Sequence, residues 1–344
     1  MIERPDSTPV AMTGYDTKIQ SDNQKMPMPD HAVRWSGLYF ELRIHYPWGV
    51  SQPRQSTSFH HRIVVSFRAH AKINLGLLVL EKRPDGYHSI ETVFHRVGLF
   101  DEISLDTSAD VIIESSSPEA PGDERNICFK AARLLREQLK IRSGVKISIQ
   151  KNIPVGAGLG GGSSDAAAVL LHLPAFWSRT IEEEQLFSLA LQLGSDVPYF
   201  LKNGSAHAKG RGDILIHFPL DIPYAILLCN PGVHVSTAWA YQRITPHKRS
   251  IDLVTIVRNG MNDPKRLREI GNDFEPTALE TYPVIREVKN IMMENGAAFS
   301  LMTGSGSTVF GFCDTIERAE KTSHVLEARG FQVHVTPPHF VPDG

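Results

Sequence analysis

Apolar and polar residues follow strand-like patterns at several places beyond residue 61. Some segments alternate apolar and polar positions, as half-buried strands do, and others are short apolar runs typical of buried strands. Turn-forming residues such as Pro84-Asp85-Gly86 separate some of these segments. Strands are therefore predicted at 63–67, at 72–80, after the turn at 84–86 and through 94, and at 145–150, 224–229 and 308–312.

Other segments place apolar residues three or four positions apart, which is the spacing of an amphipathic helix. Helices are predicted at 126–140, at 164–173 with an end at Pro174, from a capping box at 180–183 to an end at Gly194, and at 282–295 before Gly296. Because helices and strands interleave, we predict a mixed α/β (α+β) fold of two domains.

The chain has 344 residues, enough for two domains, and the patterning divides it into three parts. Residues 1–61 are rich in Pro, Ser, Gln and Asp and show no lasting periodicity, although several aromatic residues occur between Trp35 and Trp48. Two interpretations of this extension stay open: a flexible tail, or an upstream extension of the gene model. We expect a domain at 62–218, a second at 219–344, and a chain beginning near Arg62 that folds and works alone.

Charge and composition exclude several classes of protein. The 36 basic and 38 acidic residues nearly balance, and no Lys/Arg run alternates with aromatics as in a nucleic-acid binder. Apolar runs such as Tyr224–Cys229 are too short to cross a bilayer. The three cysteines are far apart and lack the spacing of a metal site. We therefore predict a cytoplasmic protein with reduced, buried thiols, and no nucleic-acid, membrane or obligate protein partner.

A glycine-rich loop at 154–164 carries the strongest chemical signal. Its glycines let backbone N–H groups approach a bulky anion, and the helix that follows favours negative charge at its N-terminus. Ser163 and Ser164 add hydroxyl groups that can cap the helix or contact a phosphate. A plain flexible loop before a serine-capped helix is the alternative. We predict a phosphate-binding loop that consists of Pro154, Val155, Gly156, Ala157, Gly158, Leu159, Gly160, Gly161, Gly162, Ser163 and Ser164.

Two familiar phosphate loops fit this segment poorly. Gly156, Gly158 and Gly161 satisfy GxGxxG, but a dinucleotide-binding fold needs an acidic residue at a strand end about twenty positions later. Glu182 and Glu183 fall near that distance in the predicted capping box of a helix. A Walker loop is excluded because no GK[ST] follows. A dehydrogenase stays as a weaker alternative.

Several separated segments resemble one kinase superfamily, that of galactokinase, homoserine kinase, mevalonate kinase and phosphomevalonate kinase. Within it, the chain resembles the family of 4-diphosphocytidyl-2-C-methylerythritol kinases from about Val64 to Phe312. The segments that carry the resemblance are Ala71-Lys72-Ile73-Asn74-Leu75, Arg83-Pro84-Asp85-Gly86-Tyr87-His88, the glycine loop, Gly194-Ser195-Asp196-Val197-Pro198, Asn272-Asp273-Phe274-Glu275-Pro276 and Gly304-Ser305-Gly306-Ser307-Thr308-Val309-Phe310.

The resemblance implies a ribosomal-protein-S5-like N-terminal domain, a smaller α/β C-terminal domain, and an active site in the cleft between them. It implies ATP-dependent phosphorylation of the C2 hydroxyl of 4-diphosphocytidyl-2-C-methylerythritol, with Mg²⁺, in the non-mevalonate route to isoprenoid precursors. The small-molecule acceptor is the expected partner. Two alternatives are a kinase that acts on mevalonate or homoserine and a nucleotide-binding sensor without turnover.

Lys72 and Asp196 are the expected catalytic pair. Lys72 and Asn74 share one face of a strand, where a surface lysine is the ordinary alternative. Asp196 follows the helix end at Gly194, where an aspartate commonly caps a turn. By resemblance, Lys72 orients the substrate hydroxyl and stabilises negative charge, Asn74 contacts the substrate, and Asp196 accepts the hydroxyl proton.

The other implied site residues fall into two groups. Asn126 and Lys151 match positions near the nucleotide, although each has an ordinary alternative, a helix cap and a solvated strand end. Tyr87 and His88 match the pair that meets the cytosine by stacking and hydrogen bonding, and ordinary strand residues beside a hairpin are the alternative. The implied substrate-binding set is completed by Tyr241, Gly304, Ser305 and Gly306, and no protein residue is assigned to a metal.

Overall fold

The long antiparallel pair of strands β1 (Val65–Lys82) and β2 (His88–Ser108) is the central element of the fold. It is seen in a computed structural model that describes residues 65–246 and 251–342. The predictions for residues 1–61 lie outside these ranges. Strand β1 is one continuous strand, so the two separate strands predicted at 63–67 and 72–80 are wrong. A register shift between His70 and Lys72 lets the strand continue through this segment without a turn.

The first sheet is built around β2 and has six strands in the described part of the chain. One edge of β2 pairs with β1 along its length, while the other edge pairs with β4 at its end and β5 near its start. Strand β3 runs parallel to β4, and β6 is antiparallel to β5. The added strands are β3 (Val111–Ser115), β4 (Gly144–Gln150), β5 (Ser205–Lys209) and β6 (Ile214–Phe218).

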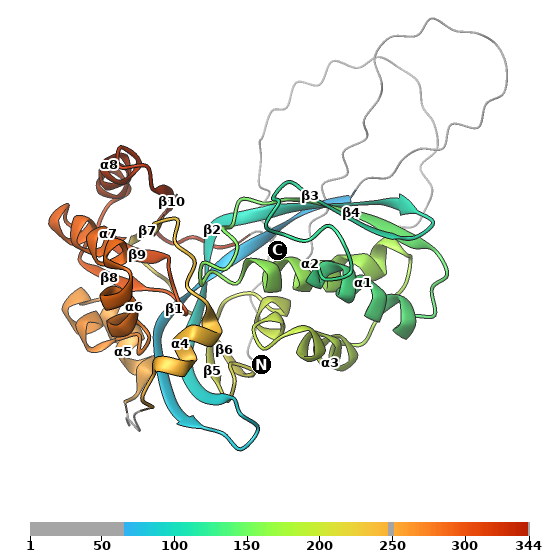
Figure 1. Cartoon of the computed structure of the whole chain (residues 1–344), viewed down its shortest axis with the longest axis horizontal. Coiled ribbons are helices and arrows are strands. Elements are labelled where there is room, and N and C mark those ends of the chain that lie inside the picture. The colour runs from blue at the N-terminus through green and yellow to red at the C-terminus, as the bar shows by residue number, and fades with distance from the viewer. Residues whose placement is uncertain (1–64, 247–250, 343–344) are drawn as a thin grey trace, which may run out of the picture. The chain divides into compact units, whose positions relative to one another are not determined.

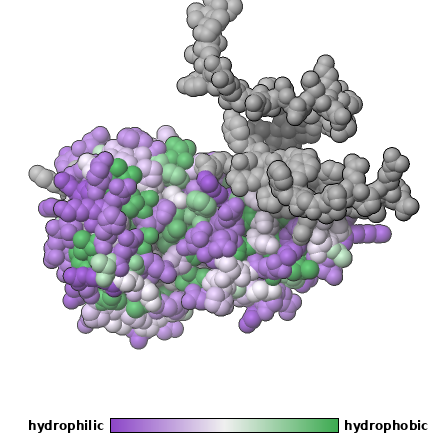
Figure 2. Space-filling model, turned by 90° about the horizontal axis from the view of Figure 1, so that it is seen from above, coloured by the Kyte–Doolittle hydropathy of each residue, from purple (hydrophilic) through white to green (hydrophobic). Residues whose placement is uncertain are grey.

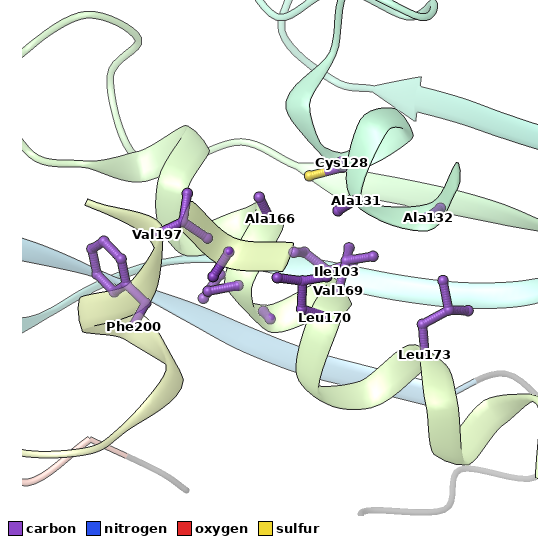
Figure 3. Packing of buried hydrophobic residues seen from close by; sticks show 14 of the residues in the cluster. Ile103, Cys128, Ala131, Ala132, Ala166, Val169, Leu170, Leu173, Val197 and Phe200 are labelled. Carbon is purple, nitrogen blue, oxygen red and sulfur yellow. The ribbon is translucent and has the colours of Figure 1, made fainter. Parts of the chain in front are cut away.

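Three helices lie together on one side of the β1–β2 pair, as Figure 1 shows: α1 (Ile127–Gln138), α2 (Gly161–Phe176) and α3 (Glu183–Leu193). A short 3₁₀ helix, η1 (Val197–Leu201), follows α3. Cys128, Ala131 and Ala132 of α1 lie near Ala166, Val169 and Leu170 of α2 in the buried layer beneath the sheet (Figure 3). Because small side chains alternate with branched ones there, helix and sheet can pack closely.

Two helix boundaries differ from the predictions. Helix α2 begins at Gly161 and continues past Pro174, so the predicted end at Pro174 is wrong. Pro174 has no backbone N–H to donate, but the following helical turn keeps its hydrogen bonding, because Trp177 N still donates to Leu173 O at 3.1 Å. Helix α3 begins at Glu183, and its N-cap Glu182 makes no side-chain capping bond. The predicted capping box is therefore wrong, although the predicted helix end at Gly194 is confirmed as its C-cap.

Within the described ranges, the second sheet has four antiparallel strands in the order β10-β7-β9-β8. Its strands are β7 (Ala225–Asn230), β8 (Phe299–Met302), β9 (Val309–Cys313) and β10 (Gln332–Thr336). Helices α7 (Pro283–Glu294) and α8 (Ile316–Glu327) pack on these strands. The remaining elements of this part are α4 (Thr237–Arg243), α5 (Leu253–Gly260), η2 (Pro264–Glu269) and α6 (Glu275–Thr281). The predicted mixed α/β architecture is confirmed, and the helices expected at 126–140 and 282–295 appear as α1 and α7.

Strand β1 also pairs with the segment that precedes α6. Near Gly76 its register with β2 shifts, and Leu77 N donates to Gly271 O at 2.9 Å while Asp273 N donates to Leu77 O at 2.9 Å. A Cβ at Gly76 would lie 2.6 Å from the Ile270 side chain, so only glycine allows this close approach. The first sheet ends at Phe218 and the second begins at Ala225, but a domain boundary at 218/219 stays a prediction.

The surface gives little sign of a large apolar patch on the face that Figure 2 presents. Hydrophilic residues cover most of the visible described surface, and hydrophobic residues are scattered among them. Within 65–246 and 251–342, no helix combines the length and apolarity that a membrane span requires.

The buried layer in Figure 3 yields a stability prediction. Ile103 of β2 is fully buried under α2, so Ile103→Ala should lower the free energy of unfolding by about 2–5 kcal/mol through lost packing. Ile112 of strand β3 is 44% exposed, so Ile112→Ala should change the free energy of unfolding by about 0.5 kcal/mol or less. Urea unfolding of both variants measures the difference, and equal losses would contradict this account of the core.

Candidate functional site

The predicted phosphate loop lies between β4 and α2 and depends on left-handed backbone at three glycines. Gly156, Gly158 and Gly160 have φ values of 67°, 80° and 69°. A Cβ at Gly158 would lie 2.2 Å from the carbonyl oxygen of Thr303, which belongs to the turn between β8 and β9. The loop and this turn are therefore in direct backbone contact, which a side chain at Gly158 would prevent.

The β8–β9 turn is fixed by hydrogen bonds from several directions. Thr303 N donates to Thr308 O at 2.9 Å, and Thr308 N donates to Ala157 O at 3.3 Å. The side-chain amide of Asn272 donates to Met302 O and Gly304 O at 2.7 and 2.8 Å. A rigid turn carrying Gly304 and Ser305 thus closes one side of the glycine loop.

These segments line a cavity of about 520 Å³, to which strands of the first sheet, helix α4 and the turn between β8 and β9 contribute residues. The predicted site between the two parts of the chain is therefore present as a cavity. It contains most of the predicted site residues: Lys72, Asn74, Asn126, Lys151, Pro154, Val155, Gly156, Ala157, Gly158, Gly160, Gly161, Gly162, Ser163, Asp196, Tyr241, Gly304 and Ser305.

Five predicted residues do not line this cavity. Leu159 is 1% exposed and packs in the core, and the Ser164 hydroxyl donates to His70 O at 2.7 Å. Gly306 lies against Met302, while Tyr87 and His88 lie at the margin, at the start of β2. Most of the loop therefore lines the cavity, while Leu159 and Ser164 attach it to β1 by hydrogen bonds with Lys72 N and His70 O.

Lys72 is buried at the centre of the cavity wall. Its side chain is 5% exposed, so the alternative of a surface lysine is wrong. Its Nζ donates to Asn74 Oδ1 at 2.7 Å and Gly158 O at 3.2 Å, and it lies 3.6 Å from Asp196 Oδ2. Burial lowers the pKa of Lys72 below its usual range, and the charge of Asp196 opposes this shift.

Asp196 precedes η1 and faces Lys72. Its side chain makes no capping hydrogen bond at η1, so the alternative of a turn cap is wrong. One third of the side chain is exposed, which leaves it open to a molecule in the cavity. Lys72 and Asp196 therefore form a pair in which the cation is buried and the carboxylate is accessible.

Two threonines that the motifs did not assign hold Asn74 in place. Asn74 Nδ2 donates to Thr92 Oγ1 at 2.9 Å, and Asn74 N donates to Thr303 Oγ1 at 2.9 Å. Both threonines are buried, so they fix the amide that accepts the Lys72 hydrogen bond.

Lys151 belongs to a second buried charge cluster, behind the start of α2. Its Nζ contacts Asp101 Oδ2 and lies 2.8 Å from Asp165 Oδ2, with only 5% of the side chain exposed. The alternative of a solvated strand end is therefore wrong. Burial would lower the pKa of Lys151, but the two carboxylates outweigh this and raise it. Burial raises the pKa of Asp165.

Asn126 is a helix cap, as its ordinary alternative predicted, and it also lines the cavity. Its Oδ1 accepts from Cys128 N at 2.9 Å, which caps α1, and its side chain lines the cavity near Arg125. The sequence motifs did not assign Arg125 to the site. The same is true of Asp165, Arg211 and Phe274, which also line the cavity. Asp165 directly follows the glycine loop in the sequence, but nothing in the sequence identified Arg211.

Aromatic rings gather where the cavity meets the β1–β2 turn. Tyr241 of α4 stacks on His88 with ring centroids 5.0 Å apart, and Phe274 meets Tyr241 edge-on at 4.8 Å. Tyr87 is 57% exposed, and the Arg211 guanidinium lies 5.2 Å from its ring centroid. Stacked and exposed aromatic faces of this kind suit a planar base.

A glycine loop at a helix N-terminus, facing a paired lysine and aspartate across a two-part α/β fold, defines the class of GHMP small-molecule kinases. Family models agree: the GHMP kinases N terminal domain matches residues 126–204, and the GHMP kinases C terminal matches 253–331.

Individual relatives define the membership more closely. A 4-diphosphocytidyl-2-C-methyl-D-erythritol kinase of Prosthecochloris aestuarii is 41% identical over 281 residues, covering 80% of this chain and 98% of the relative. One from Chlorobium limicola is 42% identical with the same coverage. The chain belongs to the family of 4-diphosphocytidyl-2-C-methyl-D-erythritol kinases.

Solved structures are consistent with this membership. A crystal structure of 4-(cytidine 5'-diphospho)-2C-methyl-D-erythritol kinase has a TM-score of 0.69 and 33% identity, covering 80% of this chain and 99% of that one. A homoserine kinase from Cytophaga hutchinsonii has a TM-score of 0.63 but only 20% identity, with coverage of 83% and 98%. The similarity to the homoserine kinase shows a shared fold alone.

The opposite orientations of Ser163 and Ser164 yield a prediction. Ser164→Ala should lower the free energy of unfolding by about 1–3 kcal/mol, because the buried hydrogen bond from the Ser164 hydroxyl to His70 O is lost. Ser163→Ala should leave stability nearly unchanged and weaken ATP binding, because Ser163 lines the cavity at the helix start. Thermal unfolding and calorimetric ATP titration of both variants are the measurements. The reverse pattern would mean that Ser164, and not Ser163, faces the nucleotide.

Proposed function

We propose that this protein transfers the γ-phosphoryl group of ATP to the C2 hydroxyl of 4-diphosphocytidyl-2-C-methyl-D-erythritol, in the non-mevalonate route to isoprenoid precursors. The observation that carries the proposal is the 3.6 Å approach of Lys72 to Asp196 beside the glycine loop. Relatives that are 38–42% identical carry this enzyme name, which favours it over mevalonate or homoserine kinase. The paired charged groups argue against a sensor without turnover.

ATP is expected to bind with its phosphates on the glycine loop. The backbone N–H groups from Gly156 to Gly162 and the N-terminus of α2 supply donors and a favourable dipole. Ser163, Asn126 and Arg125 line the same cavity. The buried pairing of Lys151 with Asp165 fixes α2 beneath the loop and supports the phosphate site from behind.

Asp196 and Lys72 would act on the acceptor. Asp196 accepts a hydrogen bond from the C2 hydroxyl, orients its oxygen toward the γ-phosphorus and takes its proton as the P–O bond forms. Lys72 donates to the oxygens on which negative charge accumulates, while the bond between the γ-phosphorus and the ADP oxygen breaks. Phosphoryl transfer depends mostly on positioning and charge stabilisation, which the rigid Asn74, Thr92 and Thr303 network provides.

Mg²⁺ is part of the proposal. The described residues contain no cluster of three His, Cys, Asp or Glu arranged for a metal ion. Mg²⁺ in kinases needs only one or two carboxylates together with phosphates, however. Asp165 fits, because it lines the cavity and its Oδ1 has no hydrogen-bond partner among the described residues. Asp165 and Ser163 would hold the ion, which neutralises phosphate charge when bound.

The cytosine of the acceptor is proposed to bind at the aromatic margin. Tyr87 would stack on the base, His88 would hydrogen-bond its edge, and Tyr241 would cover the other face. In the structure His88 and Tyr241 stack on each other, so their present contact lies at the entrance that the base would use. Gly304, Ser305 and Gly306 of the second sheet's turn would contact the acceptor and phosphates.

The predicted location in the cytoplasm and the absence of a protein or nucleic-acid partner remain proposals. The location is supported by three cysteines that are buried and unpaired, as expected in a reducing compartment.

ADP release should depend on one acceptor. The purified protein should form ADP from ATP and Mg²⁺ with 4-diphosphocytidyl-2-C-methyl-D-erythritol and much more slowly with mevalonate or homoserine. A coupled ADP assay over these acceptors is the measurement, with a reaction lacking acceptor as control. Faster turnover of mevalonate or homoserine would refute the proposed acceptor.

The roles of Asp196 and Lys72 are separately testable. Asp196→Asn should lower kcat by roughly 10²–10⁴ while ATP affinity stays nearly unchanged, since the carboxylate acts on the acceptor hydroxyl. Lys72→Met should also lower kcat, through lost charge stabilisation. Asp221→Asn is a matched control, because this carboxylate is exposed and pairs with His339 outside the cavity. Near-normal kcat in Asp196→Asn would rule out its role as base.

A further inference from the structure

We infer that Arg211 binds the diphosphate group that joins the cytidine and erythritol parts of the acceptor, an inference that rests on the proposed function. Arg211 lies in the turn between β5 and β6 and lines the cavity. Neither the sequence motifs nor the family resemblance assigned it a role.

The backbone of this turn is fixed next to the catalytic pair. Ile90 N donates to Gly210 O at 2.7 Å, which ties the turn to β2. A Cβ at Gly212 would lie 3.7 Å from Asp196 Oδ1, so the turn passes beside the proposed base. Gly210 and Gly212 have φ values of 70° and 99°, a left-handed backbone that suits glycine on both sides of Arg211.

The guanidinium is oriented before any ligand binds. Asp213 Oδ2 accepts from Nε at 3.3 Å and Nη2 at 3.2 Å, and Asp213 Oδ1 accepts from the Arg211 backbone N–H at 2.9 Å. The Tyr87 ring lies on another side of the guanidinium, at 5.2 Å. Two of the five guanidinium N–H groups are used by Asp213, and the others can reach a further acceptor. With 33% of the side chain exposed, part of it remains accessible.

The position of Arg211 matches the order of chemical groups in the acceptor. The Arg211 guanidinium lies 5.2 Å from the ring of Tyr87, the proposed base contact, and Asp196, the proposed hydroxyl contact, lies beside the next residue, Gly212. In the acceptor, the diphosphate lies between the base and the reacting hydroxyl. An acceptor bound with its base at Tyr87 and its hydroxyl at Asp196 would therefore place its diphosphate near Arg211.

The remaining charges on the cavity wall favour the same assignment. Of the described cavity-lining residues that follow Asp196 in the chain, Arg211 is the one with a charged side chain. Lys151 is enclosed by Asp101 and Asp165, and Arg125 lies beside Asn126 at the nucleotide end. The planar guanidinium of an arginine presents pairs of N–H donors, which are suited to bidentate binding of phosphate oxygens.

The test is calorimetric binding to wild type, Arg211→Met and Lys209→Met, with the ATP site filled by a non-hydrolysable ATP analogue. Lys209 is the matched control, since it carries the same charge on the same hairpin but pairs with Glu91 outside the cavity. The probes are the full acceptor, cytidine diphosphate and cytidine. Arg211→Met should weaken binding of the first two by about ten- to 150-fold, the range for hydrogen bonds to a charged group. Cytidine and ATP affinities should change less than about twofold, and Lys209→Met should resemble wild type.

The outcomes separate this inference from the proposed function. If wild type neither binds nor phosphorylates the acceptor, the proposed function fails and the inference fails with it. If wild type does both and Arg211→Met keeps its affinity for cytidine diphosphate, only the inference fails. Equal weakening of cytidine and cytidine diphosphate would show that Arg211 acts by supporting Tyr87, which also overturns it. An unchanged thermal unfolding midpoint in Arg211→Met excludes misfolding, and Arg211→Lys, which keeps the charge, should recover part of the lost affinity.

Discussion

The rest of the site depends on the direct backbone contact between the glycine loop and the turn between β8 and β9. Gly158 approaches Thr303 so closely that even a methyl group would overlap its carbonyl oxygen. Gly158 O in turn accepts from Lys72 Nζ and Thr303 Oγ1. One peptide group therefore joins the phosphate loop, the buried lysine and the second sheet, and the positions of all three are coupled.

Burial of charge is the second constraint on the site. Lys72 and Lys151 are both removed from water, and each is compensated by nearby carboxylates and hydrogen-bond acceptors. The two clusters differ in access: Asp196 is partly exposed to the cavity, whereas Asp101 is fully buried and also accepts from the backbone of Asn152 and Ile153. Lys72 and Asp196 are therefore suited to chemistry on a ligand, whereas Asp101 and Lys151 hold α2 and its loop in place and fix Asp165 at the cavity wall.

Much of the fold followed from local patterns, and the errors share a cause. Helices α1 and α7 and strands β4, β7 and β9 appeared close to their predicted ranges, because each has a clear apolar period and an ordinary boundary residue. The predicted break in β1, the stop at Pro174 and the capping box at Thr180 relied on single residues. Tertiary packing outweighed these local signals: the helix continued past its proline, and β1 continued through a bulge.

For the site, the sequence by itself predicted a phosphate-binding loop, because glycine spacing is a local property, and the resemblance of its short motifs singled out Lys72, Asn74 and Asp196. Only the tertiary structure decided which of two adjacent serines faces the cavity, since the β1 carbonyl that binds Ser164 lies 94 positions away. The same holds for Arg211, because Tyr87 beside it and Asp196 beside the adjacent Gly212 belong to separate parts of the chain. Their proximity results from the pairing of β2 with β5, a long-range contact that no local pattern encodes.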